Sequence, residues 1–310
     1  MRVMVILNPY ADLGDGLRKK ELIEQEGERL GGLDLAVTEN RGHAQNLARL
    51  AVEDGYDVVV AAGGDGTIHE VVNGLVQDGR SSVKLGIIPI GSGNDFAYAL
   101  NIPADVPMAM EVIYGGHSRA VDLGAVVDNR GVYKLFDNNL GIGFDANVVI
   151  RVEEITRLHG FLKYFWGVLK TLALDFRPFH FQMRFDDENL AHDVIFVTFG
   201  LGTRHGGGFM LTPNAHLEDN LIDTCTVRPM GRLRALALLS SAVKGTHIGL
   251  PEVSMRQNQQ IEISCTQPLP IHIDGEVFSR PEDGVHQLTI TSLPAAVDVI
   301  VKLAASEVIV

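Results

Sequence analysis

Hydrophobic residues in the first part of the chain fall into short continuous runs separated by segments with helical spacing. Residues 3–7 and 85–90, and 56–62 apart from Asp57, are apolar or glycine at successive positions, which is typical of strands that are buried on both faces. Polar segments with helical spacing lie between them, at 17–30 and 44–54. This alternation predicts a doubly wound parallel α/β domain over residues 1–123.

The pattern changes after about residue 123, where short β-like segments follow one another with turns between them. Turns are expected at 129–131 and 186–189. A mostly antiparallel β-sandwich domain is therefore predicted over residues 124–310, interrupted by helices over 152–174 and 231–244. Whether residues 296–310 return to the first domain stays open. The predicted strands are 119–127, 132–136, 179–185, 193–199, 221–227, 260–265, 270–274 and 285–292.

Composition narrows the class of protein. Hydrophobic residues make up 46% of the chain and charged residues 21%, which suits packed cores. The net charge of -13 has the wrong sign for a nucleic-acid partner. Cys225 and Cys265 are far apart in sequence, so two buried thiols are expected rather than a zinc site. The first residues lack the apolar run of a signal peptide, and the longest helical apolar stretch, 235–243, is too short to span a bilayer. A cytoplasmic location is expected.

A glycine-rich loop, residues 63–67, lies where the strand at 56–62 should end and a helix should begin. Thr67 and Glu70 have the spacing of a capping box, which predicts that the helix starts at Thr67. Glycines at a helix start let backbone N–H groups approach an anion such as phosphate. Asp65 would repel a bare phosphate, so the loop predicts a metal–nucleotide complex. The alternative is a tight structural turn without a ligand.

A second loop repeats this arrangement, because residues 91–95 follow the strand at 85–90 and precede another helical segment. Two such loops at the carboxyl edge of one parallel sheet suit a nucleotide that lies across that edge. Familiar alternatives are absent from the sequence. It contains no Gly-Lys-Ser/Thr of a P-loop, no Gly-x-Gly-x-x-Gly fingerprint and no His-Glu-x-x-His.

These motifs, taken in order, resemble the diacylglycerol kinase catalytic family, which includes bacterial lipid kinases and is related to sphingosine kinases and more distantly to NAD kinases. The resemblance covers nearly the whole chain. Its segments are Asn8-Pro9, Gly63-Gly64-Asp65-Gly66-Thr67, Gly91-Ser92-Gly93-Asn94-Asp95-Phe96-Ala97, Asp122, Gly143-Phe144-Asp145-Ala146, Gly206-Gly207-Gly208 and Asp274-Gly275-Glu276.

The resemblance implies an NAD kinase/diacylglycerol kinase-like fold and a Mg²⁺- and ATP-dependent lipid kinase. Glu276 would act as general base, and Asp65 and Asp274 would organise the catalytic Mg²⁺. A second, structural Mg²⁺ would be held by the Asp219 side chain and the carbonyls of His216 and Leu221. The implied nucleotide contacts are Asn8, Pro9, Tyr10, Ala11, Asp12, Thr38, Gly63, Gly64, Asp65, Gly66, Thr67, Ile68, His69 and Ser92.

The chain departs from the family pattern at three positions. No lysine is adjacent to Asn8-Pro9, so either Arg18 or Lys19 replaces it or that contact is missing. Ser92 stands where threonine is usual and keeps the hydroxyl group. Asn220 follows Asp219 where glycine is usual, and asparagine tolerates a left-handed backbone.

The acceptor expected from the resemblance is diacylglycerol at a membrane surface, with the protein cytoplasmic or peripheral on the inner face of the membrane. Phosphatidylglycerol or a sphingoid base are alternative acceptors. NAD kinase activity, or a regulatory protein that binds nucleotide with little catalysis, are alternative functions. The helix over 158–173 is apolar and aromatic with lysines at its fringe, so it would either pack in the core or meet lipid at an interface. Homodimerisation stays open.

Overall fold

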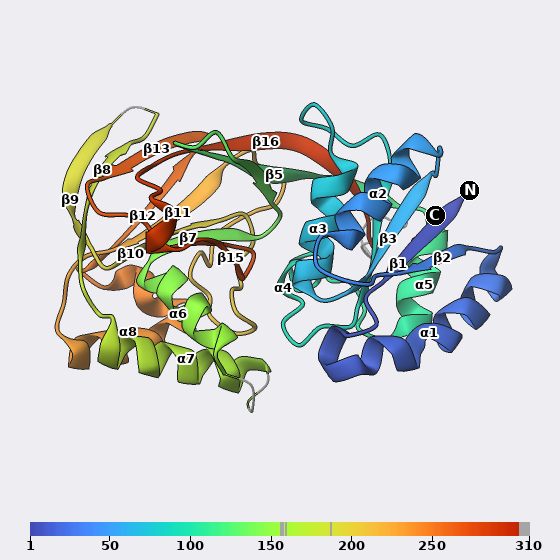
Figure 1. The fold of residues 1–310 in the computed structure, drawn as a ribbon, viewed down its shortest axis with the longest axis horizontal. Coiled ribbons are helices and arrows are strands. Elements are labelled where there is room, and N and C mark those ends of the chain that lie inside the picture. Colours follow the sequence, from blue (N-terminus) through green and yellow to red (C-terminus); the bar gives the residue numbers. More distant parts are fainter. Residues whose placement is uncertain (156–157, 159, 187, 304–310) are drawn as a thin grey trace. The chain divides into compact units, whose positions relative to one another are not determined.

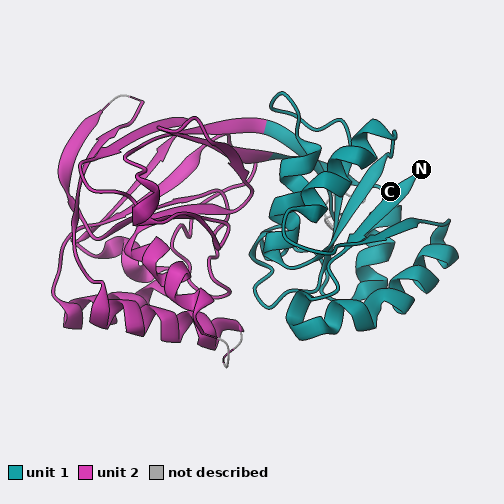
Figure 2. Cartoon of the chain, viewed as in Figure 1, with its two compact units in different colours: residues 1–121, 295–310 teal, residues 122–294 magenta. Residues whose placement is uncertain are grey.

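The computed structural model describes residues 1–155, 158, 160–186 and 188–303. The chain forms two compact units (Figure 1, Figure 2), unit 1 with Met1–Val121 and Ala295–Val310 and unit 2 with Asp122–Pro294. The chain passes between them within β5 (Ser118–Asp128) and β16 (Gln287–Ile300). Three sequence predictions include residues outside this described part. The helix predicted over 152–174 includes 156, 157 and 159, the turn predicted over 186–189 includes 187, and the segment 296–310 includes 304–310.

Unit 1 is built on a parallel sheet with strand order β2-β1-β3-β4 and the end of β16. Helices α1 and α5 bury Ile23, Met110 and Ile113 against one face, and Figure 1 shows α2 and α3 on the other. The predicted doubly wound domain is confirmed. Its elements are β1 (Val3–Leu7), α1 (Ala11–Leu30), β2 (Asp34–Val37), α2 (His43–Glu53), β3 (Val58–Gly63), α3 (Asp65–Leu75), β4 (Lys84–Pro89), α4 (Asp95–Ala99) and α5 (Val106–Gly115).

Unit 2 contains antiparallel strands in two sheets. One has the order β12-β11-β10-β7-β14-β15, and the other joins β9, β8, β13, the first part of β16, β5 and β6. Helices α6, α7 and α8 pack on the former through a core that includes Phe144, Val168 and Leu238. The elements are β6 (Tyr133–Phe136), β7 (Asn139–Gly143), α6 (Phe144–Glu153), α7 (Gly160–Leu174), β8 (Phe179–Arg184), β9 (Asn189–Val194), β10 (Phe196–Gly200), β11 (Ile222–Val227), α8 (Arg232–Ala242), β12 (Val253–Asn258), β13 (Gln260–Cys265), β14 (Ile271–Ile273) and β15 (Glu276–Ser279).

Two predictions about unit 2 are wrong in detail. The strand predicted over 193–199 is divided between β9, which pairs with β8, and β10, which lies in the other sheet between β7 and β11. Ile195 separates them, and its backbone bonds to Val227 and Phe144 instead of to β8. The helix predicted over 152–174 is two helices, since α6 ends at Glu153 and α7 begins at Gly160.

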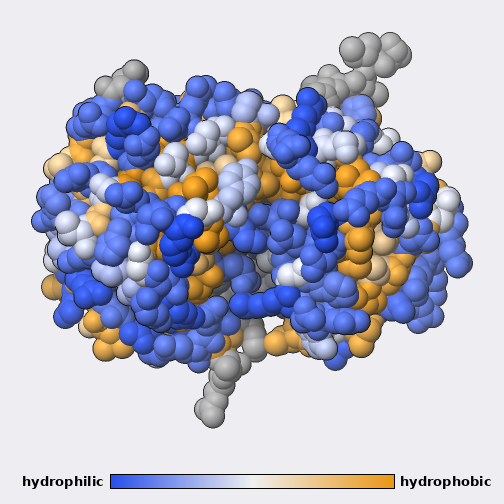
Figure 3. All heavy atoms as spheres, turned by 45° about the horizontal axis from the view of Figure 1, so that its top comes forward, coloured by the Kyte–Doolittle hydropathy of each residue, from blue (hydrophilic) through white to orange (hydrophobic). Residues whose placement is uncertain are grey.

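The surface in Figure 3 is largely hydrophilic, with hydrophobic groups exposed between the polar side chains. Among the described residues, no helix combines the length and apolar character that crossing a membrane requires. Cys225 and Cys265 are buried free thiols, as expected.

Candidate active site

The turn after β1 is tied to the ends of the neighbouring strands. Asn8 Nδ2 donates to Thr67 Oγ1 at 3.0 Å, and the Asn8 backbone N–H donates to the Ala62 carbonyl in β3 at 2.9 Å. The Thr38 backbone N–H, just beyond β2, donates to the Leu7 carbonyl of β1 at 2.9 Å. Asn8, Thr38 and Thr67, all expected to contact nucleotide, therefore lie at one carboxyl edge of the parallel sheet.

The two glycine loops touch each other at this edge. A Cβ atom on Gly64 would lie 3.1 Å from the Cα of Gly91, and a Cβ atom on Gly91 would collide with the Cα of Gly64. Asn94 shapes the second loop, because its side chain accepts from the Gly91 N–H at 2.9 Å and donates to the Gly91 carbonyl at 2.6 Å. Its φ of 53° is left-handed, which asparagine tolerates better than most residues. Side chains at either glycine would force the loops apart.

The start of helix α3 differs from the sequence prediction. The helix begins at Asp65, and its N-cap residue, Gly64, provides no side-chain hydrogen bond. The predicted capping box of Thr67 and Glu70 is wrong. Instead, the Glu70 carboxylate accepts the backbone N–H groups of Gly42 and Ala44 at 2.7 and 3.1 Å, at the start of α2. Glu70 thus caps a neighbouring helix.

Asp65 points its carboxylate toward the start of α4. Its Oδ1 accepts the backbone N–H of Asp95 at 2.7 Å. Burial and the negative charge of Asp95 raise the pKa of Asp65 well above its usual range, and hydrogen bonds from the backbone of Asp95, Phe96 and Asn94 offset this only in part. Two carboxyl groups in one partly buried place favour a cation that would compensate their charges.

The remaining residues expected to bind nucleotide lie around the same edge. Residues 12–14 have three successive positive φ angles of 43°, 61° and 91° inside α1. The Ser92 hydroxyl donates to Asp12 Oδ1 at 3.0 Å, so this kink is linked to the second glycine loop. Tyr10 is 75% exposed, whereas Ile68 and His69 are buried. Lys19, considered as a replacement for the missing lysine, pairs with Asp15 at 2.9 Å.

In unit 2, Asp274 and Gly275 form the two-residue turn between β14 and β15. Their φ angles of 48° and 79° are both left-handed, as a tight hairpin with an Asp-Gly turn requires. The buried Asp274 carboxylate accepts three backbone N–H groups, with Oδ2 taking Asp137 at 3.1 Å and Oδ1 taking Asn138 at 3.0 Å and Asn139 at 2.8 Å. Sequence reasoning assigned no role to residues 137–139, which hold this carboxylate.

Glu276, the expected general base, is the first residue of β15 and pairs with Ile273 across the turn. It is partly exposed. Tyr164 of α7 lies beside the turn, because a Cβ atom on Gly275 would be 2.9 Å from the Tyr164 hydroxyl oxygen. The Tyr164 ring also packs closely on Gly206, where a Cβ atom would lie 2.9 Å from Cδ1. The glycines at 206 and 275 therefore make room for one aromatic side chain next to Glu276.

The buried His272 of β14 and the partly buried Asp145 of α6 form a polar pair. His272 Nε2 is 3.3 Å from Asp145 Oδ2, which also accepts the Thr198 hydroxyl at 2.5 Å. Burial alone would raise the pKa of Asp145, but the charge and hydrogen bond of His272 and the bond from Thr198 outweigh it and lower this pKa. A side chain at Gly141 would collide with both Asp145 and His272. The pair thus requires glycine at position 141.

The residues expected to hold a structural metal ion precede β11. Asp219 and His216 are exposed, and Asp219 Oδ1 accepts the Leu221 N–H at 3.0 Å. Asn220 is left-handed, with φ of 59°, as its replacement of glycine predicted, and its N–H donates to the buried Asp122 at 2.6 Å. Burial raises the pKa of nearby Asp223, and the charge of Asp219 adds to this.

Comparison with known proteins agrees with this architecture. The family model described as "Diacylglycerol kinase catalytic domain" matches residues 2–126, and the one described as "YegS C-terminal NAD kinase beta sandwich-like domain" matches residues 138–301. A diacylglycerol kinase of Mycobacterium tuberculosis is 31% identical over 259 residues, which cover 83% of this chain and 81% of the relative. The chain belongs to the diacylglycerol kinase family.

Further similarities support this membership. A diacylglycerol kinase of Staphylococcus aureus is 31% identical over 283 residues, 89% of this chain and 86% of the relative. A solved structure described as a putative diacylglycerol kinase from Bacillus anthracis has a TM-score of 0.79 at 23% identity and covers 97% of each chain, which shows the fold. As a member of the diacylglycerol kinase family, the chain is a kinase of the lipid kinase type.

The residues expected to bind nucleotide come together at one edge of unit 1, and Asp274 and Glu276 meet in one turn of unit 2. Sequence reasoning missed that Asp122 accepts a hydrogen bond from the Asn220 N–H. It also missed that the backbone N–H groups of 137–139 donate to Asp274. The run Asp137-Asn138-Asn139 was the available signal, because consecutive short polar residues are frequent where backbone groups bond locally.

Proposed function

We propose that this kinase transfers the γ-phosphate of Mg-ATP to the hydroxyl group of diacylglycerol, with Glu276 as general base. The acceptor oxygen bonds to the γ-phosphorus, the bond from that phosphorus to the β-phosphate oxygen breaks, and Glu276 takes the hydroxyl proton. The products are phosphatidic acid and ADP. The observation that carries the proposal is the Asp274-Gly275 hairpin, which fixes a buried carboxylate and presents the partly exposed Glu276 directly after it.

The glycine loops of unit 1 are proposed to receive the nucleotide phosphates. Gly64 and Gly91 have no side chain, so the two loops approach each other closely and their backbone is open to a ligand at these positions. At the start of α3 the Thr67 and Ile68 N–H groups bond to the Gly64 carbonyl, so the N–H groups before them are the ones proposed to meet the phosphates, and the helix dipole favours an anion at this end. Asn8 and Thr67, bonded to each other, hold the neighbouring turn in place.

The carboxylates suit magnesium, which prefers oxygen ligands. When bound, it neutralises charge on the transferring phosphate groups. Asp65 is proposed to help hold it, because burial and the neighbouring Asp95 carboxylate raise the pKa of Asp65 and make its negative charge costly unless a cation lies beside it. Three backbone N–H groups hold the Asp274 oxygens in a fixed orientation, and this carboxylate is proposed as a second magnesium ligand. Asp219, with the carbonyls of His216 and Leu221, is the proposed structural site.

The test is a transfer assay with radiolabelled ATP and Mg²⁺ against diacylglycerol, phosphatidylglycerol, a sphingoid base and NAD. Glu276→Gln should lower kcat for diacylglycerol by ~10²–10⁴ and leave ATP binding unchanged, since general base catalysis contributes about that much. Glu282→Gln, at an exposed glutamate in the same region, is the matched control.

Each alternative has its own outcome. Near-normal turnover by Glu276→Gln would remove the proposed base. Labelling of NAD alone, or of another lipid in preference to diacylglycerol, would replace the proposed acceptor. Nucleotide binding without transfer to any acceptor would favour the regulatory alternative.

A further inference from the structure

Helix α7 is apolar on two faces, and the core of unit 2 covers one of them. Val168 and Leu172 are buried in the core that α7 shares with α6 and α8. On another face, Leu162 is 65% exposed, Phe165 38% and Trp166 54%. Helical spacing continues this exposed stripe through Leu169 to Ala173. A helix with one apolar face in the core does not need a second one for folding.

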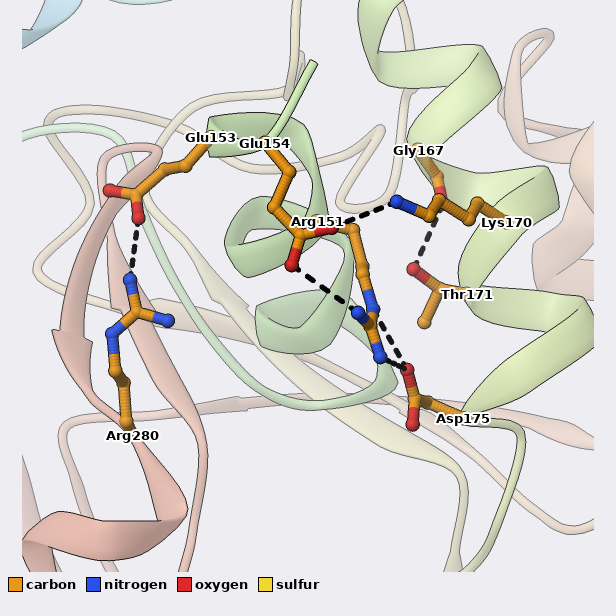
Figure 4. Close-up of polar contacts among 8 residues, drawn as sticks. All are labelled: Arg151, Glu153, Glu154, Gly167, Lys170, Thr171, Asp175 and Arg280. Carbon is orange, nitrogen blue, oxygen red and sulfur yellow. Dashed lines mark hydrogen bonds and ion pairs between the residues drawn. The ribbon is translucent and has the colours of Figure 1, made fainter.

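The helix is held firmly, so the exposed stripe keeps its orientation within unit 2. Figure 4 shows Arg151 of α6 bonded to Asp175, just beyond α7, with nitrogen–oxygen distances of 2.7 and 3.0 Å. Lys170 of α7 reaches back to Glu154 at 2.8 Å. Arg280, just after β15, bonds to Glu153 at 2.6 Å and so links the catalytic hairpin to the end of α6.

The inner face of α7 reaches the proposed catalytic turn. Phe161 packs on Gly208 and on the Phe209 ring, with ring centroids 5.3 Å apart. Tyr164 lies against Gly275, next to Glu276. Because an α-helix with its side chains is about 10–12 Å across, the exposed stripe and the turn are separated by roughly one helix diameter.

The geometry points to α7 as a bilayer-docking helix, with the stripe of Leu162, Phe165, Trp166, Leu169 and Ala173 inserted at the boundary between head groups and acyl chains. This inference rests on the proposed lipid acceptor. The hydroxyl of an acceptor lipid lies at that same boundary, so a docked α7 brings it within about a helix diameter of Glu276. The lipid then needs to move only a short way out of the bilayer.

The chemistry of the stripe matches a lipid interface better than another protein. Tryptophan beside aliphatic residues is typical of side chains at the head-group level. Lys163 borders the stripe on the helix surface, where its ammonium group can meet a lipid phosphate, whereas Lys170 is already paired with Glu154. The whole chain has a net charge of -13, so attraction to anionic lipids contributes little. Insertion of the apolar side chains, rather than charge, is expected to dominate binding.

Trp166 permits a direct measurement, because it is the single tryptophan of the chain. The full-length protein without ATP is mixed with phosphatidylcholine vesicles, with and without diacylglycerol. We expect a blue shift of Trp166 emission, protection from an aqueous quencher, and quenching by lipids brominated on the acyl chain. Leu162→Gln should weaken partitioning about tenfold, since roughly one leucine side chain is withheld from the apolar phase. Leu50→Gln, at a 46% exposed leucine in α2, should leave it unchanged.

Several results would overturn the docking inference. One is that vesicles leave the Trp166 emission unchanged. Another is that Leu162→Gln and Leu50→Gln weaken vesicle partitioning equally. A third is that sedimentation shows a dimer for the wild type and a monomer for Leu162→Gln. The last would identify the stripe as a contact between two copies. Activity on a short-chain, monomerically dispersed diacylglycerol separates the two proposals: transfer without vesicle binding refutes docking alone, and vesicle binding without transfer to any lipid refutes the acceptor alone.

Discussion

Replacing Asp274 with asparagine tests a role in the fold that is independent of catalysis. Asparagine keeps the size of the side chain and tolerates the φ of 48° at this position. Its single carbonyl oxygen can still accept the N–H groups of Asn138 and Asn139, but the Asp137 N–H then faces an amide NH₂ group. A buried N–H without an acceptor costs about 1–3 kcal/mol, and loss of the negative charge weakens the other two bonds.

These contributions give an expected loss of about 3 kcal/mol in the free energy of unfolding of unit 2. For a domain of this size, 1 kcal/mol lowers Tm by about 2–4 °C, so a decrease of about 6–12 °C is expected. Trp166 lies in unit 2 and is the single tryptophan, so its fluorescence follows the urea or thermal unfolding of that unit.

The chain contains a matched control for this substitution. Asp78 and Gly79 form a second Asp-Gly turn, with φ angles of 49° and 86° and a bridge between Gln77 and Arg80. The Asp78 side chain is exposed. Asp78→Asn should change stability by less than about 0.5 kcal/mol in a unit 1 unfolding experiment. If Asp274→Asn were as mild as Asp78→Asn, the reasoning that the carboxylate holds the backbone at 137–139 would be refuted.

Three further substitutions test other parts of the chain. Asp65→Asn keeps an acceptor for the Asp95 N–H but removes the negative charge. Phosphoryl transfer should fall at least ~10²-fold while unit 1 stays folded. Full activity with an unchanged Mg²⁺ requirement would show that Asp65 has only a structural role. Wild-type Tm should rise with Mg²⁺, and Asp219→Ala should abolish this rise; a Tm indifferent to both leaves no basis for the structural site. Glu70→Gln should destabilise unit 1 by about 1 kcal/mol, measured by circular dichroism, because one oxygen cannot serve the N–H groups of Gly42 and Ala44 equally; an unchanged unfolding curve would contradict this.

The parallel sheet of unit 1 could be predicted because burial on both faces leaves a continuous apolar run at each strand. The capping box predicted from Thr67 and Glu70 is wrong for a reason that the local sequence does not contain. Thr67 and Glu70 have the right spacing, but their side chains bond to Asn8 and to the start of α2, which are distant in sequence. A local pattern cannot show that a tertiary partner competes for the same side chain.

The division of residues 189–200 into two strands has a similar cause. Residues on both sides of Ile195 are β-like in composition, so the sequence reads as one strand. The backbone of Ile195 instead bonds to Val227 and Phe144, and the chain moves from one sheet to the other at this residue. The faces of α7 were equally hidden, since its apolar residues nearly surround the helix and the sequence does not show which of them the core covers.

The hairpin at Asp274 shows why the roles of site residues need measurements other than activity. Resemblance to the family implies a metal-organising carboxylate, whereas the structure shows three backbone N–H groups on the same two oxygens. These roles are compatible, because a carboxylate that is already oriented loses less freedom when it meets a cation. They are also confounded, because any substitution that removes the charge disturbs both the turn that presents Glu276 and the proposed metal ligand. Loss of activity in an Asp274 variant is therefore not enough to assign a metal-binding role. The assignment requires a loss of activity larger than the measured loss of stability explains, in a variant where Glu276 keeps its position.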